Sequence, residues 1–442
     1  MTDSISRVGA HSHIRGLGIR DGEPLPVADG LVGQEEARKA AWVVVQLIRS
    51  GKMAGRAVLL AGPPGTGKTA LAVAIARELG GETPFMSLTA SEVYSAELKK
   101  TEVLMQAMRK AIGVRIREQR WVYEGVVEKL DVQFGRHPLN PWQQVPLGAT
   151  VVLKTKKEER TLKVGSQVVA QMLQRGVEEG DVIWIDEETG RVVRVGKARG
   201  REGYEVVGKS DLVDVPDGPV YKEKEFVYTL TLHDLDVMHG RSESIFTLLF
   251  GGAPQREIPP DVRARVDKLV KSWVEEGKAE LLPGVLFIDD AHMLDIEVYS
   301  FLSRAMESEL APIIILATNR GFTKIRGTDV VAPHGMPLDL LDRLLIIKTR
   351  LYKPEEIREI LKIRAEEEGV KLSEDALERL VEIGTVNSLR YAVQLLTPSL
   401  IIARQKGREE VASEDVEEAG RLFISTNESA RYLQEYEEKM LK

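Results

Sequence analysis

The feature that most constrains the fold of this 442-residue chain is a glycine-rich octapeptide between two segments of different type. Its residues are Gly62, Pro63, Pro64, Gly65, Thr66, Gly67, Lys68 and Thr69. The apolar run 56–61 before it is typical of a buried parallel strand, and the helical pattern of residues 68–79 after it stops at Gly80. This order is that of a P-loop, in which glycines let backbone N–H groups turn toward bound phosphates. The motif predicts an α/β fold with a phosphate-binding loop.

Two side chains of this loop carry the expected nucleotide chemistry. We expect Lys68 to reach the β- and γ-phosphates of ATP, and the Thr69 hydroxyl to bind Mg²⁺. The positive end of the following helix adds a favourable field for anions. A chance loop of the same composition is the alternative, and the strand and helix on either side count against it.

A second apolar run, residues 285–288, ends at the acidic pair Asp289 and Asp290. An acid at the carboxyl end of such a strand is typical of a Walker B motif, so Asp289 is expected to hold Mg²⁺ directly or through water. Asp290 is then placed to orient and polarise the attacking water, with a capping or surface acid as the alternative. Asn319 follows the next strand, residues 313–317, and is expected to position water near the γ-phosphate. A simple turn before a glycine is the alternative for Asn319.

Two arginines complete the set of candidate catalytic residues. Arg343 follows an apolar turn, and in a nucleotide-hydrolysing core it is expected to be a finger that reaches the γ-phosphate of a neighbouring subunit. Arg390 begins a helix of the last part of the chain and is expected to contact the phosphates of its own subunit. A surface ion pair is the alternative for each arginine.

The P-loop and the Walker B strand are much farther apart than a minimal core requires, and the character of the chain changes between them. From Trp121 to about residue 208, short alternating runs separated by glycine and charged turns predict a small antiparallel, barrel-like β domain. Helical patterns are expected over 97–119 and 259–280, and again from residue 354 onward. We therefore divide the chain into the first part of a core (1–120), an inserted β domain with a flanking helix (121–283), the second part of the core (284–352) and a helical lid (353–442).

The charge balance gives no overall electrostatic argument for nucleic acid, because 61 Lys and Arg stand against 68 Asp and Glu. The insertion nevertheless contains basic residues that are candidates for a groove along a phosphate backbone: Lys154, Lys156, Lys157, Arg160, Arg191, Arg194, Lys197, Arg199 and Arg201. Acidic residues lie close to them in sequence, so a solvated surface of salt bridges is the alternative. Trp142 and Trp184 are candidates for stacking on bases, although a core position is the alternative for Trp184.

The sequence contains no cysteine, which excludes disulfides and thiolate zinc sites and suits a reducing compartment. Few asparagines and many charged residues are typical of a heat-adapted protein. No apolar run approaches the roughly 20 residues needed to span a bilayer, and the first residues lack the apolar stretch of a signal peptide. We expect a soluble protein without membrane contact, in the cytoplasm of an archaeal-like source, with the nucleus as the alternative.

Several longer segments are far more specific than the Walker motifs, and through them the sequence resembles the RuvB-like AAA+ ATPases of the pontin/reptin family over nearly its whole length. These segments are Ala10–Gly18, Gly30–Gln34, Ser91–Ser95, Lys99–Leu104, Ala291–Ile296 and Arg390–Leu396. The resemblance implies an AAA+ P-loop core, an OB-fold within the insertion and a helical lid. It also implies ATP hydrolysis, with ATP or ADP and Mg²⁺ bound.

The resemblance further implies which residues hold the nucleotide. His11 and His13 would contact it and gate its exchange, although a His-Ser-His sequence read alone is more often exposed or a chance metal-binding pair. Beyond the P-loop, the implied contacts are Gly30, Leu31, Val32, Ala70, Tyr352, Ile360, Leu389 and Arg390.

The family is associated with homohexamers or double hexamers joined through the insertions, with DNA helicase activity and DNA repair, and with chromatin remodelling and the assembly of large protein complexes. The implied partners are other copies of the chain, proteins of such complexes, and single- or double-stranded DNA or RNA. Two functions follow: a motor that moves on DNA, or an ATP-switched assembly factor. A P-loop kinase or transporter ATPase is a poorer fit, since neither needs both a finger at Arg343 and a helical lid with Arg390.

One departure from the family concerns Asp290, where the family normally has glutamate. The shorter side chain places its carboxylate about an ångström from the best position for orienting water, which costs on the order of 100-fold. We therefore expect slow ATP hydrolysis. Together with the near-neutral composition, this favours the assembly factor.

Overall fold

A computed structural model of the chain describes residues 11–53, 55–94, 98–136, 144–199, 212–242 and 257–440. Ala10, Ser95, Trp142 and Arg201, which the sequence analysis used, lie outside these ranges. The chain forms two compact units. The first comprises Met1–Val114, Thr229–Val274 and Glu280–Lys442, and the second comprises Arg115–Tyr228 and Glu275–Ala279.

The first unit is built on a five-stranded parallel sheet with the order β19-β5-β16-β15-β6. The strands are β5 (Ala57–Ala61), β6 (Phe85–Thr89), β15 (Val285–Asp289), β16 (Ile313–Thr318) and β19 (Leu344–Lys348). Every residue of β5 and β16 is buried, which explains the unbroken apolar runs in the sequence. The predicted α/β fold is confirmed, as are the strands expected at 56–61, 285–288 and 313–317.

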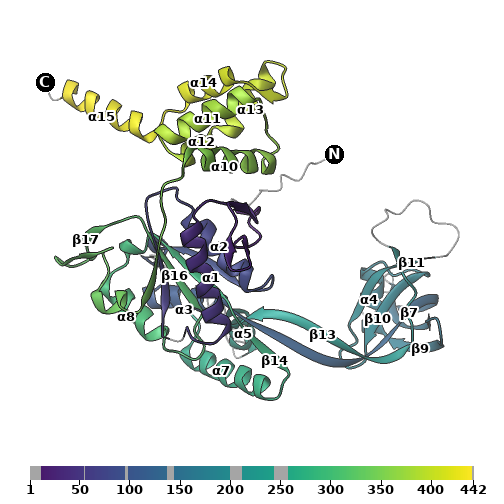
Figure 1. Ribbon diagram of the computed structural model, residues 1–442. Coiled ribbons are helices and arrows are strands. Elements are labelled where there is room, and N and C mark those ends of the chain that lie inside the picture. Colours follow the sequence, from purple (N-terminus) through teal and green to yellow (C-terminus); the bar gives the residue numbers. More distant parts are fainter. Residues whose placement is uncertain are drawn as a thin grey trace. The chain divides into compact units, whose positions relative to one another are not determined.

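Helices cover both faces of this sheet (Figure 1). They are α1 (Glu35–Arg49), α2 (Lys68–Leu79), α3 (Lys100–Lys110) and α8 (Ile296–Ala305). Val58 and Leu60 of β5 belong to the core with α1 and α2, whereas Leu59 belongs to the core with α3 and α8. This division follows from the alternation of side chains along a strand. Because the strands are parallel, the P-loop, Asp289 and Asn319 all follow strand ends at the same edge of the sheet.

The segment before α1 forms two small hairpins that Arg38 holds in place. They consist of β1 (Ile19–Arg20) with β2 (Glu23–Pro24) and β3 (Val27–Ala28) with β4 (Leu31–Val32). The buried guanidinium of Arg38 donates to the carbonyl oxygens of Leu17 at 2.7 Å, Leu25 at 2.6 Å and Gly18 at 2.6 Å. A single α1 side chain therefore fixes the path of the N-terminal segment.

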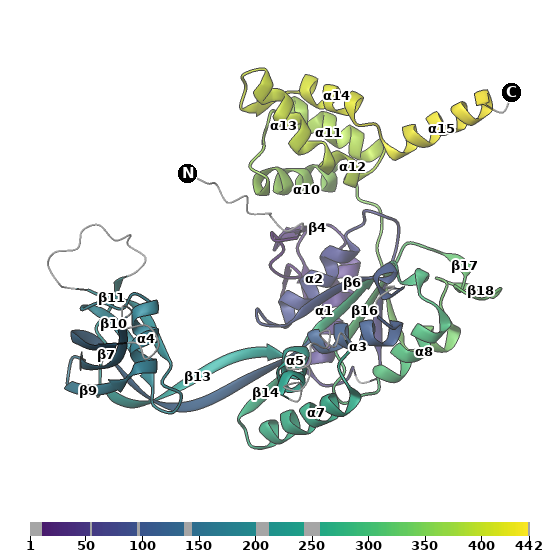
Figure 2. The same ribbon diagram turned by 180° about the vertical axis from the view of Figure 1, so that it is seen from behind.

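Between β16 and β19 the chain forms a short hairpin, labelled β17 and β18 in Figure 2, and then one helical turn. These are β17 (Phe322–Lys324), β18 (Val331–Pro333) and α9 (Leu338–Leu341). Two 3₁₀ turns, η1 (Ala90–Tyr94) and η2 (Ala291–Met293), follow β6 and β15. The turn η2 begins directly after Asp290, so it sets the backbone at the end of the Walker B strand.

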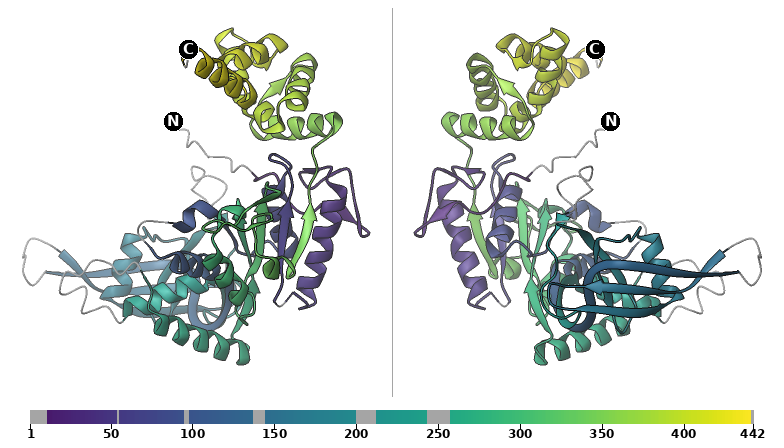
Figure 3. Two further views of the ribbon diagram at one scale, coloured as in Figure 1. Left: turned by 90° about the vertical axis from the view of Figure 1, so that its left-hand side faces the viewer. Right: turned by 90° about the vertical axis from the view of Figure 1, so that its right-hand side faces the viewer.

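The last part of the chain is helical and has its own apolar core, coloured light green to yellow in Figure 3. Its elements are α10 (Pro354–Glu367), α11 (Glu374–Val386), α12 (Leu389–Gln394), α13 (Leu396–Gln405), α14 (Ser413–Leu422) and α15 (Thr426–Met440), with β20 (Lys371–Leu372) paired to β21 (Glu410–Val411). Ser373 and Ser388 cap α11 and α12 through their hydroxyl oxygens. Across the described ranges of the chain, no helix is long and apolar enough to cross a membrane.

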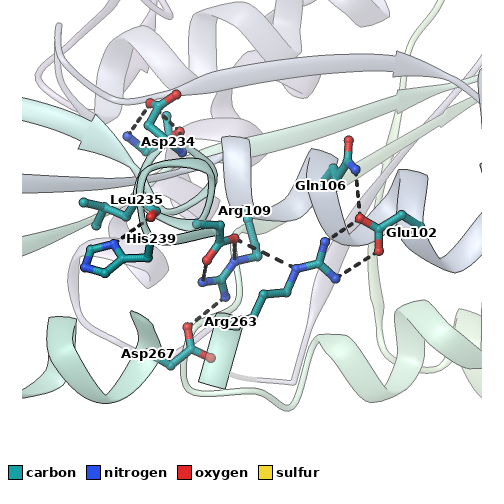
Figure 4. Close-up of polar contacts among 10 residues, drawn as sticks. Glu102, Gln106, Arg109, Asp234, Leu235, His239, Arg263 and Asp267 are labelled. Atoms are coloured by element: carbon teal, nitrogen blue, oxygen red, sulfur yellow. Dashed lines mark hydrogen bonds and ion pairs between the residues drawn. The ribbon is translucent and has the colours of Figure 1, made fainter. Parts of the chain in front are cut away.

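A buried ion network joins α3 to two further helices of the first unit (Figure 4). These are α5 (Leu232–Ser242) and α7 (Pro260–Glu275). Arg109 of α3 donates to both carboxylate oxygens of Asp236, which is fully buried, and to Asp267 at 2.8 Å. Arg263 binds Glu102 through two hydrogen bonds of 3.0 and 2.5 Å. The network connects α5 and α7, which follow the long segment Arg115–Tyr228 of the second unit, to a helix that precedes that segment.

The second unit contains most of a sheet with the order β12-β11-β10-β7-β8-β9, in which β13 and β14 also pair with β7. The strands of this sheet are β7 (Ile112–Arg136), β8 (Gln144–Lys154), β9 (Glu159–Gly165), β10 (Asp181–Asp186), β11 (Val192–Ala198), β12 (Leu212–Val213), β13 (Tyr221–Thr231) and β14 (Ala279–Pro283). Helix α4 (Ser166–Gln174) of the second unit follows β9. The unit has a separate apolar core around Val127, Val151 and Ile183. It consists mainly of strands, as the alternating runs predicted.

The expected helix over 97–119 is wrong in its second half. Helix α3 ends at Lys110, and strand β7 begins at Ile112. Ile112, Val114 and Ile116 are buried, whereas Arg117 is exposed, so the side chains follow the period of a strand. The apolar residues of the true helix and of this strand together imitated one long helical pattern.

Candidate functional site

A cavity of about 500 Å³ opens at the carboxyl ends of the sheet strands, between the P-loop, the N-terminal segment and the helical lid. Most of the predicted nucleotide-site residues line it: His11, His13, Gly30, Leu31, Val32, Pro64, Gly65, Thr66, Gly67, Lys68, Thr69, Ala70, Asp289, Asp290, Asn319, Tyr352, Ile360, Leu389 and Arg390. Its size falls in the range usual for small-molecule and cofactor sites. Residues far apart in the sequence therefore meet around one space.

The P-loop has the backbone that its glycines permit. Gly65 and Gly67 have φ angles of 75° and 80°, and α2 begins at Lys68. The ammonium group of Lys68 donates to the carbonyl oxygens of Gly62 at 2.9 Å and Pro63 at 2.8 Å. Burial lowers the pKa of Lys68, and the nearby Asp289 opposes that shift. A cation thus lies at the loop that leads into the N-terminus of α2, where an anion is favoured.

The two Walker B acids have different surroundings. A carboxylate oxygen of Asp289 accepts the backbone N–H of Asp290 at 2.9 Å. Asp290 has φ 51° and ψ 39°, the left-handed conformation that aspartate adopts more readily than most residues. The next turn is held by Tyr299, whose hydroxyl donates to the carbonyl oxygen of Ala291 at 2.6 Å. The backbone of Asp290 is therefore fixed from both sides.

The donor set in the cavity suits Mg²⁺. The Thr69 hydroxyl and the Asp289 carboxylate both line it, and both are hard oxygen ligands. Mg²⁺ sites typically use one or two such groups and complete their coordination with phosphate oxygens and water. Within the described ranges, no group of three or more His, Cys, Asp or Glu forms a metal site of protein ligands alone. The cavity therefore fits a metal that arrives with a nucleotide.

His11 and His13 lie at the cavity with their ring centroids 6.4 Å apart. Burial lowers the pKa of each imidazole. The cation of Arg364 adds to that shift in both. The buried Nδ1 atom of His13 has no hydrogen-bond partner among the described residues. An unpaired buried polar atom beside a cavity is a ready contact for a ligand.

The helical lid contributes residues from the connector and from two helices. Tyr352 donates its hydroxyl to the carbonyl oxygen of Thr66 at 3.3 Å, and burial raises its pKa to about 12. Sequence reasoning missed Arg364, Val393 and Gln394, which also line the cavity. Helical spacing was the available signal, because they lie three or four residues after Ile360, Leu389 or Arg390 on the same helices.

Three predicted residues lie outside the cavity lining. Gly62 and Pro63 belong to the back of the P-loop, where their carbonyl oxygens hold Lys68. Arg343 is exposed and pairs with Glu307 at 2.5 Å. Within one chain, the described structure therefore assembles the predicted site without Arg343.

Two family models match the chain. The TIP49 P-loop domain matches residues 7–355, and the TIP49 AAA-lid domain matches residues 360–425. These stretches contain the core and the lid residues that line the cavity. The chain therefore belongs to the TIP49 family of RuvB-like pontin/reptin proteins and is an AAA+ ATPase of that type.

Proposed function

We propose that the cavity binds ATP and ADP with Mg²⁺ and that the chain hydrolyses ATP in a ring of identical subunits, either one hexamer or two. The observation that carries this proposal is the composition of the cavity. It gathers the predicted phosphate, metal and water-handling groups from the core and the lid, and it leaves out Arg343 alone among the candidate catalytic residues. If a neighbouring subunit supplies the arginine finger, the cavity of a single subunit should lack the Arg343 guanidinium, as it does here.

Each side chain has a defined task in this account. Lys68 leaves its two loop carbonyls and binds the β- and γ-phosphates, while Thr69 and Asp289 hold the metal. When bound, Mg²⁺ supplies charge neutralisation at the phosphate oxygens. Asp290 accepts a hydrogen bond from the attacking water and orients it, and Asn319 steadies the same water from the neighbouring strand.

The lid and the N-terminal segment close the nucleotide in. Arg390 reaches the phosphates from the start of α12, where its backbone is fixed by the Ser388 cap. His11 and His13 are neutral at pH 7 because burial lowers their pKa values, so they contact the nucleotide as neutral rings. Their segment is the movable wall of the cavity and gates exchange.

Arg343 acts on the next subunit. Its side chain is 42% exposed and the Glu307 side chain with which it pairs is also exposed, so little free energy holds it in place. In the ring, the guanidinium exchanges Glu307 for the γ-phosphate of the neighbour. Arginine fingers of this kind contribute about 10³–10⁵ in turnover.

The ion pairs of the insertion favour an assembly factor over a motor on DNA. Of the basic residues proposed to follow a phosphate backbone, Lys154, Lys157, Arg194, Lys197 and Arg199 each pair with an acidic residue of the same unit. Paired cations have less to gain from releasing counterions on DNA. We therefore place protein partners of large complexes first, and helicase, repair or remodelling activity on DNA or RNA second.

A cluster of aromatic rings with an arginine in the insertion supports the second candidate role, binding of nucleic acid. Trp121 stacks on Tyr221 with ring centroids 4.8 Å apart, and Arg160 lies over the rings of Tyr221 and Tyr123 at 5.5 Å. Aromatic rings with an arginine are a usual platform for single-stranded bases. Trp184 is half-buried and contacts Phe226, with ring centroids 4.9 Å apart.

Two measurements test the proposal. Lys68→Ala should abolish tight ATP binding, and an affinity within twofold of wild type would contradict the P-loop assignment. The rate of ATP hydrolysis with and without single-stranded DNA at low salt separates the two roles. No response is expected for the assembly factor, while a rise of several-fold would favour the motor.

A further inference from the structure

Gln34 lies where three parts of the nucleotide site meet, although it does not line the cavity. It precedes α1, follows the cavity-lining residues of β4 and is only 7% exposed. Its φ of 53° and ψ of 36° are left-handed, and its side chain makes no capping bond to its own helix. Polar side chains at the start of a helix can accept hydrogen bonds from the first helix N–H groups, as those of Ser, Thr, Asp and Asn often do. The amide of Gln34 is directed elsewhere.

The side-chain amide of Gln34 forms hydrogen bonds with two other segments of the chain. Its Nε2 donates to the carbonyl oxygen of Thr66 in the P-loop at 3.3 Å and to that of Arg350 at 2.5 Å. Its Oε1 accepts the backbone N–H of Arg350 at 3.1 Å. Both backbone groups of Arg350 are thus satisfied by one side chain, in the manner of a strand pair.

Arg350 belongs to the short connector that joins β19 of the sheet to α10 of the lid. Its guanidinium binds both carboxylate oxygens of Glu356, at 2.8 and 2.6 Å, and it contacts Glu35 at 3.1 Å. Glu356 in turn accepts the N–H of Lys353 at the start of α10. The backbone that Gln34 holds is therefore tied firmly to the first turn of the lid.

Thr66 is the P-loop residue that is bonded to both Gln34 and the connector. Its carbonyl oxygen accepts bonds from both Gln34 and Tyr352, and its hydroxyl lies 2.6 Å from that of Thr349. Thr66 is 1% exposed and immediately precedes Gly67, whose left-handed backbone leads into Lys68. A movement of the connector must change the bonding at Thr66 and with it the shape of the phosphate cradle.

We infer that Gln34 is a positioning residue that couples the lid to the P-loop and thereby sets how fast bound nucleotide is released. When the lid moves away, the connector pulls on Gln34, which loosens Thr66 and the phosphate cradle. When the lid is closed, the same three bonds keep the cradle in its binding shape. This inference rests on the proposed nucleotide function of the cavity.

The test uses Gln34→Glu in the full-length protein. The substituted side chain has nearly the same shape, but as a carboxylate it has no donor for the carbonyl oxygens of Thr66 and Arg350. As the protonated acid it regains one donor, and burial raises the pKa of a carboxyl toward the measurable range. The rate of release of a fluorescent ADP analogue is measured by stopped flow at pH 8.5 and pH 6.0, beside wild type at each pH.

The expected result is release about tenfold or more faster than wild type at pH 8.5, the scale expected when buried hydrogen bonds are lost, and a smaller excess at pH 6.0. Damage to packing alone would lower the melting temperature, but it would not make the acceleration of release smaller at pH 6.0 than at pH 8.5. The matched control is Gln46→Glu on the same helix α1, which should leave release unchanged at both pH values. Wild type shows whether the cavity binds nucleotide at all, which separates a failure of the proposed function from a failure of this coupling.

If Gln34→Glu does not fold, Gln34→Asn takes its place, because asparagine adopts the left-handed conformation readily while its amide is one methylene too short to bridge both partners. It should accelerate release at both pH values alike. Release within twofold of wild type in a folded Gln34 variant would overturn the coupling. So would an acceleration of equal size in the Gln46 control.

Discussion

The most informative single position is Asp290. A longer side chain there would bring the carboxylate closer to the attacking water, whereas the left-handed backbone favours aspartate over glutamate. Asp290→Glu extends the carboxylate by one methylene with almost no change in intrinsic acidity. We expect turnover to rise while ATP affinity changes little, since binding depends on Lys68, the metal and the loop. Asp290→Asn should keep the backbone conformation but lower turnover strongly while still trapping ATP.

The expected change in turnover depends on two effects, the position of the carboxylate and the cost of the left-handed backbone. Correcting a displacement of about an ångström is worth on the order of 100-fold in rate. The left-handed conformation at φ 51° costs an ordinary residue about 1–2 kcal/mol, and aspartate less, so the glutamate variant should lose about 1 kcal/mol of stability. That loss leaves turnover intact if the bonds around η2 keep the backbone in place. If they do not, about fivefold of the gain is lost.

The assay is steady-state hydrolysis with separate measurement of ATP affinity and melting temperature. Asp21→Glu is a matched control for stability, because Asp21 is also left-handed at φ 51° but is exposed and away from the cavity. Asp289→Asn is the control for mechanism and should weaken Mg²⁺-dependent binding itself. Wild-type turnover in Asp290→Asn would refute the role of Asp290. An unchanged or slower Asp290→Glu would refute only the expectation of slow hydrolysis.

Three further predictions concern stability, pH and the insertion. Arg109→Ala removes two hydrogen bonds from the buried Asp236 and leaves it with the weaker contact to Arg263 at 4.0 Å. The first unit should be destabilised by about 3–5 kcal/mol, measured by denaturant unfolding; a loss below about 1 kcal/mol would contradict the network. Burial lowers the pKa values of His11 and His13, so the unfolded chain binds more protons and stability should fall as the pH drops below about 6.5. Replacing both with glutamine should flatten the fall in melting temperature between pH 7 and pH 5, and an unaltered slope would argue against their burial. Replacing residues 122–227 with a short Gly/Ser linker should preserve nucleotide binding, because the apolar cores on the two faces of the parallel sheet contain no residue of that range. A variant that cannot bind nucleotide would show that the fold of the nucleotide site depends on the insertion.

The sequence was sufficient to predict that the core residues of the candidate site lie close together, because they stand at the ends of parallel strands. Once the runs at 56–61, 285–288 and 313–317 are recognised as parallel strands, Lys68, Asp289 and Asn319 must meet at one edge of the sheet. This argument needs no knowledge of side-chain contacts. The same edge explains why Asp290 lines the cavity beside them.

Other features were not predictable, because they depend on contacts between distant segments. Gln34 and Arg350 are separated by 316 positions, and nothing in their local patterns indicates the bonds that join them. The strand at Ile112 was mistaken for helix because its apolar residues continue the spacing of α3. The lid residue Arg364 was missed because its role depends on which face of α10 is turned to the cavity.

The central claim, that neighbouring subunits share each active site, has one direct test. Lys68→Ala and Arg343→Ala proteins are each prepared, mixed in equal amounts and allowed to exchange subunits, and ATP hydrolysis is measured. Each protein alone should be nearly inactive, with Arg343→Ala lower than wild type by about 10³ or more. Mixed rings place an intact Lys68 beside an intact Arg343 at about one interface in four, so about a quarter of wild-type activity should return. If differently tagged subunits co-purify in mixed rings and no activity returns, Arg343 does not complete its neighbour's site.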